Sequence, residues 1–296
     1  MTNVPNTNTA SPSVPSLAGD EWAIRVLFPA ASLEHFIVQK PAVEPLSRVC
    51  VVDVETTGTD PLRDQIIDIG YVILLVDAEG DIIEIVSVRE ALCDPGMGIP
   101  ARISRLTGLT NSDVLGKAID LNLVQRDFQQ VDVFVAHNAR FDAGFIRQLL
   151  PSTKDAAWVC SMSDFDWLMD AGLDGRALGH LLFQVGFYNA GHRALADVIS
   201  LVHLLAYPLQ TGQPMLGALL TNAAKQTFRV EATRAPFDSR SVLKDRGYRW
   251  DASNKVWWIE VAHQNLQLEI LWIGRHVTPH GPAPKTTPIT WHQRHR

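Results

Sequence analysis

Two carboxylates stand two residues apart in an apolar segment at 48–57, where the chain reads Asp53-Val54-Glu55-Thr56-Thr57-Gly58. The β-branched residues around them predict a buried strand that ends in a turn, and side chains two apart on a strand point to the same face. Two buried anions are costly unless a cation compensates them. Carboxylate oxygens suit Mg²⁺, which keeps waters for chemistry. The pair therefore indicates a metal site, and the alternative is an edge strand with its polar face in water.

A third acid, Asp142, follows a predicted buried strand at 131–136 and lies in a helix predicted over 139–150. Asn138 precedes this helix, where its side chain can cap the first turn. Asp142 is four positions further on, which places both residues on one helical face. An acid in a first turn can also simply complement the helix dipole. Taken singly, Asp142 is open to either interpretation.

A fourth acid, Asp197, lies five residues after His192, in a helix predicted over 193–206. Asp197 has apolar neighbours, so it needs a partner, and a metal ion would be one. Imidazoles titrate near neutral pH, which allows His192 to accept a proton from a metal-bound water. A lone surface histidine is common, so this segment has only moderate specificity by itself.

Together the three segments give the order Asp-x-Glu, Asp, His-x4-Asp, which predicts a two-metal site for phosphodiester hydrolysis. The amino-acid sequences of these segments resemble those of the DEDDh family of 3′–5′ exonucleases. This family has an RNase H-like fold and includes the proofreading epsilon subunit of bacterial DNA polymerase III. The matching segments are VVDVETTGTD at 51–60, ISRLTGLT at 103–110, AHNARFD at 136–142 and HRALAD at 192–197. The resemblance covers slightly more than half of the chain.

The resemblance implies two divalent ions, Mg²⁺ or Mn²⁺. One would be held by Asp53, Glu55 and Asp197, and Asp53 would bridge to the second, which Asp142 supports directly or through water. His192 would be the general base. The implied substrate-binding residues are Thr56, Thr57, Gly58, Leu106, Thr107, Asn138 and Phe141. Of these, Leu106 and Phe141 fit core positions equally well.

The composition bounds the class of protein. The 296 residues are 46% hydrophobic and 20% charged, which is typical of a globular protein and argues against whole-chain disorder. The longest purely apolar runs, such as 72–76, are far below the roughly 20 residues that span a bilayer, so no membrane partner is predicted. The first twenty residues do not resemble a secretory signal. Three widely spaced cysteines indicate neither disulfides nor a zinc site, and a cytoplasmic location is predicted.

Hydrophobic periodicity predicts an α/β fold with a mixed sheet flanked by helices and a small α+β C-terminal domain. An antiparallel meander at 48–57, 65–76 and 81–89 precedes alternating helices and strands, one of them a strand at 177–185. The predicted divisions are a disordered tail at 1–19, a short helical segment at 20–45, the exonuclease domain at 46–208, a linker at 209–225, the small domain at 226–273 and a flexible tail at 274–296.

The charge is distributed unevenly along the chain. Residues 226–296 hold 11 Lys and Arg against 6 Asp and Glu, a balance of +5, so the net −6 leaves −11 for residues 1–225. The basic part also holds five of the eight tryptophans and interleaves Lys244, Arg246, Arg249 and Lys255 with Tyr248, Trp250, Trp257 and Trp258. This pattern favours a nucleic-acid contact. Filling of a small core, or docking onto the exonuclease domain, would explain the same residues.

The predicted function is a metal-dependent 3′–5′ exonuclease that releases nucleoside 5′-monophosphates from single-stranded or frayed DNA in proofreading, repair or nucleic-acid processing. An enzyme that trims RNA is the main alternative, because no residue visibly reads a 2′-hydroxyl. An inactive exonuclease fold that only binds is the third. A DNA polymerase and a second copy of the chain are the protein partners left open.

Overall fold

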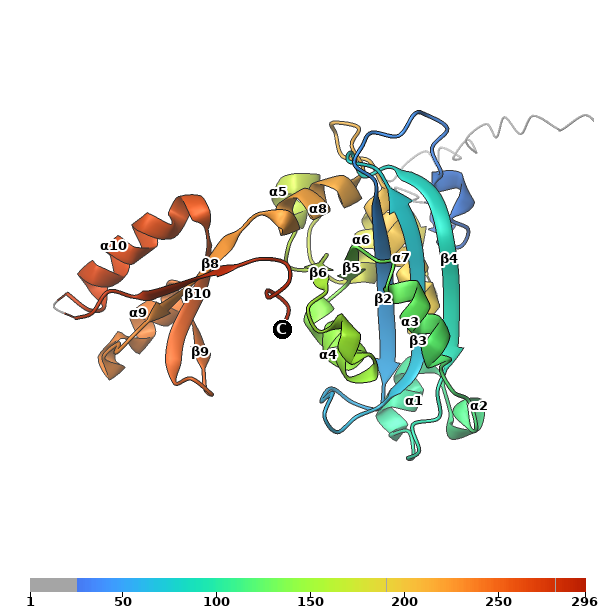
Figure 1. Ribbon diagram of the computed structural model, residues 1–296, viewed down its shortest axis with the longest axis horizontal. Helices are drawn as coiled ribbons and strands as arrows, with labels where there is room; N and C mark the ends of the chain where they lie inside the picture. The colour runs from blue at the N-terminus through green and yellow to red at the C-terminus, as the bar shows by residue number, and fades with distance from the viewer. Residues whose placement is uncertain (1–25, 190, 280) are drawn as a thin grey trace, which may run out of the picture.

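The computed structural model describes residues 26–189, 191–279 and 281–296 (Figure 1). The predicted disordered tail at 1–19 lies outside them. Within the described ranges, no helix combines the length and the apolar character needed to cross a bilayer.

A five-stranded mixed sheet forms the larger unit, in the order β4-β3-β2-β5-β6. The strands are β2 (Ser47–Thr56), β3 (Ile66–Val76), β4 (Ile82–Leu92), β5 (Val133–Ala136) and β6 (Ala157–Cys160). β2, β3 and β4 are antiparallel, whereas β5 runs parallel to β2 and β6 runs parallel to β5. The predicted α/β class with a mixed sheet is confirmed.

Helices cover both faces of this sheet. One face carries α6 (Leu178–Gln184), α7 (Ala194–Ala206) and α8 (Met215–Ala224), and the other carries α3 (Leu121–Phe128) and α4 (Ala139–Leu149). Further helices of this unit are α1 (Ala101–Thr107), α2 (Asn111–Val114), η2 (Pro151–Thr153) and α5 (Trp167–Ala171). Along β2, Val49 and Val51 pack on the α7 side, and Cys50 and Val52 pack on the α4 side. This alternation turns position 53 toward α7.

Of two predictions about local structure, one is met only in part and the other is wrong. Within the segment 20–45, the described residues form a two-residue strand β1 (Phe28–Pro29), which pairs with β7 (Phe187–Tyr188), and a single 3-10 helix η1 (Glu34–Phe36). Pro29 cannot continue a helix, so β-type pairing replaces one. The strand predicted at 177–185 is α6, whose Leu181 and Leu182 are fully buried in the core. A short apolar run does not distinguish a buried strand from a buried helix.

The predicted linker at 209–225 is also wrong, because it contains α8, whose Leu216 and Leu219 belong to the core of the larger unit. Pro214 is the N-cap residue of this helix and does not interrupt it. Gly217 allows the helix to approach the β3–β4 turn closely, since a Cβ there would lie 2.1 Å from the Glu79 carbonyl oxygen. In this segment, Gly217 therefore serves close packing and Pro214 serves helix initiation, and neither marks a linker.

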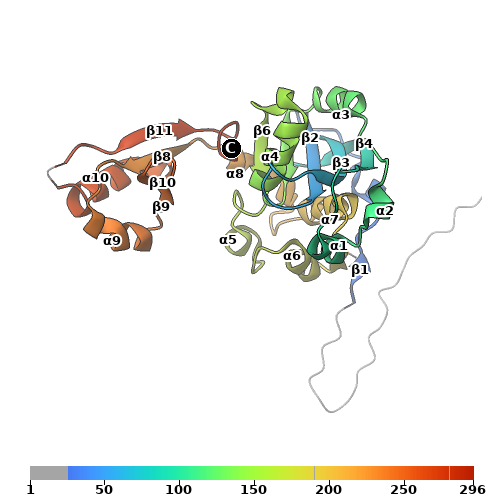
Figure 2. The ribbon, with the colours of Figure 1, turned by 90° about the horizontal axis from the view of Figure 1, so that it is seen from below.

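The small domain is an antiparallel sheet in the order β11-β8-β10-β9 with helices on one face (Figure 2). Its elements are β8 (Thr227–Ala232), η3 (Phe237–Ser239), α9 (Arg240–Asp245), β9 (Arg249–Asp251), β10 (Val256–Ala262), η4 (His263–Asn265), α10 (Leu266–His276) and β11 (Lys285–Ile289). The predicted α+β character is confirmed. The prediction of a flexible tail at 274–296 is wrong, because β11 pairs with β8 over five residues.

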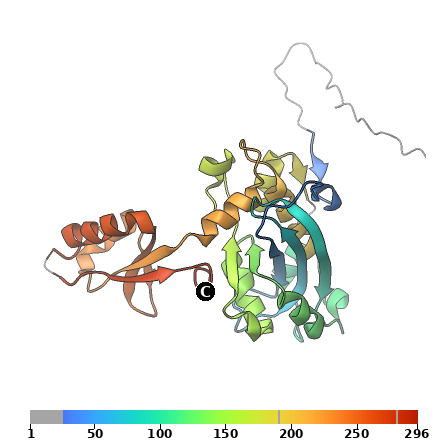
Figure 3. The same ribbon diagram turned by 45° about the horizontal axis from the view of Figure 1, so that its top comes forward.

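The last residues of the chain return to the larger unit, where the C-terminus lies between the two parts (Figure 3). The Trp158 N–H donates to the Trp291 carbonyl at 3.0 Å. Arg294 pairs with Glu260 of the small domain at 2.8 Å and donates to the Ala223 carbonyl at 2.7 Å. Because Arg294 is only 8% exposed, these bonds form a buried link between the two units.

Candidate active site

The end of β2 and the first turn of α7 lie against each other. Gly70 of β3 makes this possible, because a Cβ at Gly70 would lie 2.2 Å from the Leu195 backbone nitrogen. The close approach places Asp197, in the first turn of α7, beside the end of β2 that carries Asp53 and Glu55. The prediction that Asp53 and Glu55 share one face agrees with the core packing of their neighbours.

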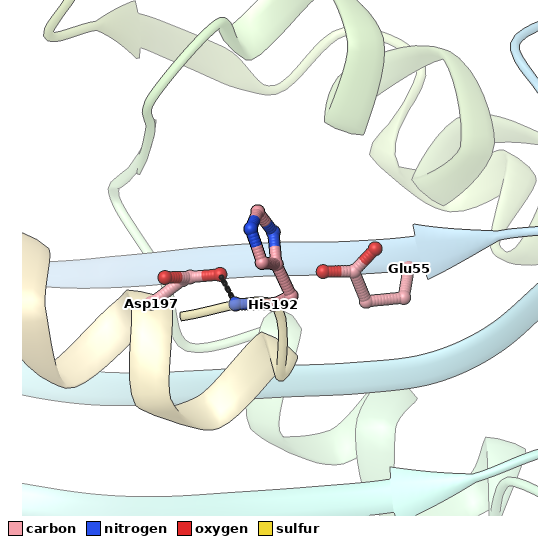
Figure 4. A group of neighbouring side chains, drawn as sticks. All are labelled: Glu55, His192 and Asp197. Atoms are coloured by element: carbon pink, nitrogen blue, oxygen red, sulfur yellow. Dashed lines mark hydrogen bonds between the residues drawn. The ribbon is translucent and has the colours of Figure 1, made fainter. Parts of the chain in front are cut away.

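Glu55, His192 and Asp197 form the centre of the site (Figure 4). One potential ligand atom from each lies within 4.8 Å of the other two. The His192 backbone N–H donates to Asp197 Oδ2 at 3.0 Å, and the Asn189 side-chain amide donates to Asp197 Oδ1 at 2.8 Å. His192 has a φ of 62°, a left-handed conformation that directs its loop back toward α7. The Asp197 carboxylate is thus held from two sides and keeps lone pairs for a cation.

Asp142 reaches the site from the opposite layer of the fold. It lies in the first turn of α4, is 1% exposed, and accepts a hydrogen bond from the Val54 N–H at 3.1 Å. Asn138 occupies the N-cap position of α4 with a φ of 82°, but its side chain makes no capping hydrogen bond. The capping role considered for Asn138 is therefore wrong, and its exposed amide lines a cavity of about 670 Å³ that also includes Arg140 and Trp258.

Burial raises the pKa values of all four acids, and neighbouring carboxylates add to this effect at Asp53, Glu55 and Asp142. Burial raises the pKa of Asp53 well above its ordinary range, and the carboxylates of Asp142, Asp197, Glu55 and Asp68 raise it further. Burial, with a smaller effect of Glu55, raises the pKa of Asp142 to about 8. Burial and the Asp197 carboxylate raise the pKa of Glu55 to about 7. Burial also raises the pKa of Asp197, although the hydrogen bonds from Asn189 and His192 oppose it.

This donor set fits divalent cations. The four charged groups that act most strongly on Asp53 are all carboxylates, so its surroundings favour added positive charge. Hard oxygen ligands on three separate elements, with one imidazole beside them, match the preferences of Mg²⁺ and Mn²⁺. The residues that would hold the ions are Asp53, Glu55, Asp142 and Asp197.

Asp68 and Arg193 support the site but were not among the predicted residues. Asp68 of β3 is fully buried and accepts a hydrogen bond from Arg193 Nε at 2.8 Å. Arg193 also pairs with Glu90 of β4 and directly follows His192. This pair ties the His192 loop to the sheet. The available signal was a single carboxylate inside the apolar run at 66–76.

The predicted substrate-binding residues lie at three places, namely the end of β2, the end of α1 and the start of α4. Thr56 is the last residue of β2, and Thr57 and Gly58 follow it. Thr57 is 3% exposed, and its hydroxyl donates to Asp64 at 3.1 Å. Thr107 at the end of α1 is also buried and donates to the Ile103 carbonyl. Leu106 is 46% exposed, so it does not fill the core, whereas Phe141 is half-buried and packs against Phe145.

Comparison with known proteins agrees with this geometry. A family profile described as exonuclease, RNase T type, matches residues 50–205. A DNA polymerase III PolC-type from Listeria innocua is 36% identical over 142 residues, 44% of this chain and 9% of that protein. The 3′-5′ exonuclease DinG of Bacillus subtilis is 32% identical over 157 residues, 51% of this chain and 16% of that protein. The chain thus spans less than a fifth of the length of either relative.

Two solved structures are similar to parts of this chain. Exonuclease X in complex with 5′ overhanging duplex DNA is 21% identical with a TM-score of 0.39, over 57% of this chain and 99% of that one. E. coli Exonuclease I in complex with a dA16 oligonucleotide is 15% identical with a TM-score of 0.49, over 77% of this chain and 68% of that one.

A mixed sheet that gathers four carboxylates and a histidine defines a DEDDh-type site. The profile match covers more than half of the 296 residues, and the chain belongs to the RNase T-type exonuclease family.

Proposed function

We propose that this chain is a metal-dependent 3′–5′ exonuclease that hydrolyses the terminal phosphodiester bond of single-stranded or frayed DNA and releases nucleoside 5′-monophosphates. The observation that carries the proposal is the cluster of Glu55, His192 and Asp197, whose ligand atoms lie within 4.8 Å of one another, with Asp53 and Asp142 beside it. Membership in the exonuclease family supports the same reaction.

Each residue of the cluster has a distinct proposed role. Asp53, Glu55 and Asp197 would hold one divalent ion, and Asp53 with Asp142 would hold the second. Two such ions, Mg²⁺ or Mn²⁺, supply stabilisation of the attacking and leaving oxygens when they are bound. His192 accepts the proton of the attacking water through its ring. The hydrogen bond from its backbone N–H to Asp197 fixes the His192 loop beside the carboxylates.

The terminal nucleotide is proposed to bind along the end of β2 and the nearby loops. Leu106 offers an exposed apolar side chain for its sugar or base, and Asn138 offers an exposed amide. Buried Thr56, Thr57 and Thr107, together with Gly58 and the half-buried Phe141, would shape the surrounding backbone. The relatives named DNA polymerase III PolC-type support DNA as the polymer. RNA is the alternative polymer that a test must include.

Two further proposals concern the setting of the enzyme. The relatives named DNA polymerase III PolC-type support a polymerase as a partner, and a second copy of this chain is the other protein partner we retain. Cys50, Cys93 and Cys160 are free thiols, which supports a reducing, cytoplasmic location.

The test uses a 20-nucleotide DNA with a 5′ fluorophore and an RNA of the same sequence, each incubated with the full chain and Mg²⁺ or Mn²⁺. We expect a ladder that shortens from the 3′ end, faster for DNA, and complete loss of it in EDTA. Asp197→Asn should abolish it, whereas Glu84→Gln, an exposed carboxyl change on β4, should not. Faster shortening of RNA would favour the RNA-trimming alternative. Binding without shortening of either polymer would contradict the proposal.

A further inference from the structure

A pocket of about 490 Å³ opens on the small domain, between the η3–α9 segment and the β9–β10 hairpin. Its volume falls in the range of ligand sites, roughly 300–1,000 Å³. Four cationic side chains line it, from Arg234, Arg240, Lys244 and Lys255, and three aromatic rings accompany them, from Phe237, Trp250 and Trp257. Within the described part of the chain, no carboxylate contributes to the lining.

The four cations are exposed and are available to an anion. The ion pairs of the small domain use other basic residues, namely Arg229, Arg246, Lys285 and Arg294. A concentration of positive charge without neutralising carboxylates raises the local potential and attracts polyanions. The pocket therefore favours a negatively charged occupant.

The aromatic rings are placed for contact with that occupant. Phe237 is 75% exposed and Trp250 is 50% exposed, and neither belongs to the core of the domain. Trp257 packs partly into that core and lies 5.5 Å from the Trp250 ring, measured between centroids. The Arg240 guanidinium lies 4.5 Å from the centroid of the Phe237 ring. Large exposed rings beside cations offer flat surfaces on which unpaired bases stack.

The basic and aromatic residues at 244–258, which are interleaved in the sequence, lie in different surroundings in the structure. Tyr248 is buried and donates to Glu269 at 2.9 Å, and Arg246 pairs with the same carboxylate. Trp258 lies on the other face of the sheet, 4.2 Å beneath the Arg229 guanidinium. These residues have structural partners. The part of the segment that lines this pocket is Lys244, Trp250, Lys255 and Trp257.

We propose that this pocket binds single-stranded DNA, with bases stacked on Phe237 and Trp250 and backbone phosphates contacting Arg240, Lys244 and their neighbours. The inference rests on the proposed function, because the strand held here is the one whose 3′ end the acidic site hydrolyses. Charge complementarity and the exposed rings together specify a ligand that is both polyanionic and aromatic. An acidic peptide satisfies only the first requirement.

The test measures the binding of 5′-fluorescein-dT20 to the full chain by fluorescence anisotropy, in EDTA so that hydrolysis does not interfere, across a series of salt concentrations. Trp250→Ala should raise Kd by about 5- to 150-fold, the loss expected for one stacked base. Arg240→Ala with Lys244→Ala should reduce the slope of log K against log salt by about 1.4, or about 0.7 per phosphate contact. Arg275→Ala is the matched control, an exposed cation on α10 outside the pocket, and should change neither quantity.

Three results would overturn the proposal. The first is that Trp250→Ala and Phe237→Ala both bind dT20 with the Kd of the unmodified chain. The second is that Arg275→Ala weakens binding as much as Lys244→Ala. The third is that poly-glutamate displaces dT20 as effectively as unlabelled dT20 does at the same concentration of negative charge. Trp250 and Phe237 are exposed, so their variants should retain the circular dichroism spectrum of the parent. The same experiment distinguishes failure of the proposed function from failure of this inference. If only the proposed function fails, dT20 still binds through the pocket, but no nucleotide is released after Mn²⁺ is added.

Discussion

Replacing Asp142 with Asn should stabilise the metal-free protein at neutral pH. Asp142 is 1% exposed, and its pKa rises from 3.8 to about 8. The folded chain therefore keeps this carboxyl protonated at pH 7, while the unfolded chain ionises it. The unfolded state then binds fewer protons than the folded state, so the free energy of unfolding falls as the pH rises from 3.8 toward 8. At pH 7 this loss amounts to about 4 kcal/mol relative to pH values below 3.8.

An amide at position 142 does not ionise, so it avoids this loss, and its oxygen can still accept the Val54 N–H. If half of the loss is recovered, Asp142→Asn gains about 2 kcal/mol, and Tm in EDTA rises by about 4–8 °C at pH 7. The gap in Tm should shrink as the pH is lowered toward 4. Thermal unfolding followed by circular dichroism at pH 4.5 and pH 7.5 measures both effects.

Asp77→Asn is the matched control for this prediction. Asp77 is 4% exposed; burial raises its pKa, but backbone N–H groups of Val43, Asp81 and Glu79 outweigh burial and leave the pKa below its ordinary value. Its stabilising effect is present above the unfolded pKa and is lost at lower pH, so Asp77→Asn should lower Tm at pH 7.5. If Asp142→Asn also lowered Tm in EDTA at that pH, the raised pKa of Asp142, which burial mainly causes, would be refuted.

Three further predictions follow from contacts around the site and between the two units. Arg193→Ala should lower kcat about tenfold with little change in KM for a DNA 20-mer, because Arg193 ties the His192 loop to buried Asp68; an unchanged kcat would exclude this positioning role. Gly70→Ala should lower Tm by several degrees and weaken Mn²⁺ binding measured by calorimetry, because its Cβ would meet the Leu195 nitrogen at 2.2 Å; full stability would show that α7 can move away freely. Arg294→Ala should increase proteolytic cleavage between the two units in a time course, because it removes buried bonds to both; cleavage at the rate of the unmodified chain would contradict the link.

The sequence was sufficient to predict the acidic cluster because its signals are local. Asp53 and Glu55 share a strand face by period two, and the ends of β2 and β5 meet at one edge of the sheet since the two strands run parallel. Asp197 could be predicted because it lies among apolar residues near the start of a predicted helix. Local pattern thus indicated which elements carry the chemistry, and the order of the segments related them to a known family.

The sequence could not reveal what depends on pairing between distant segments. Asp68 and Arg193 are 125 residues apart, and only the fold brings them together. β11 pairs with β8, although a run rich in Pro and Thr predicts little structure by itself. Gly217 serves a close contact with Glu79, which composition alone cannot distinguish from a loop glycine.

The most direct test of the central claim is the identity and origin of the product. The full chain is incubated with unlabelled dT20 and Mn²⁺, and the released nucleotides are identified by mass spectrometry beside an Asp197→Ala preparation purified in parallel. We expect thymidine 5′-monophosphate from the unmodified chain and a yield at least about 10³-fold lower from Asp197→Ala. Equal release by both preparations, or release of 3′-monophosphates, would contradict the assignment of hydrolysis to this cluster.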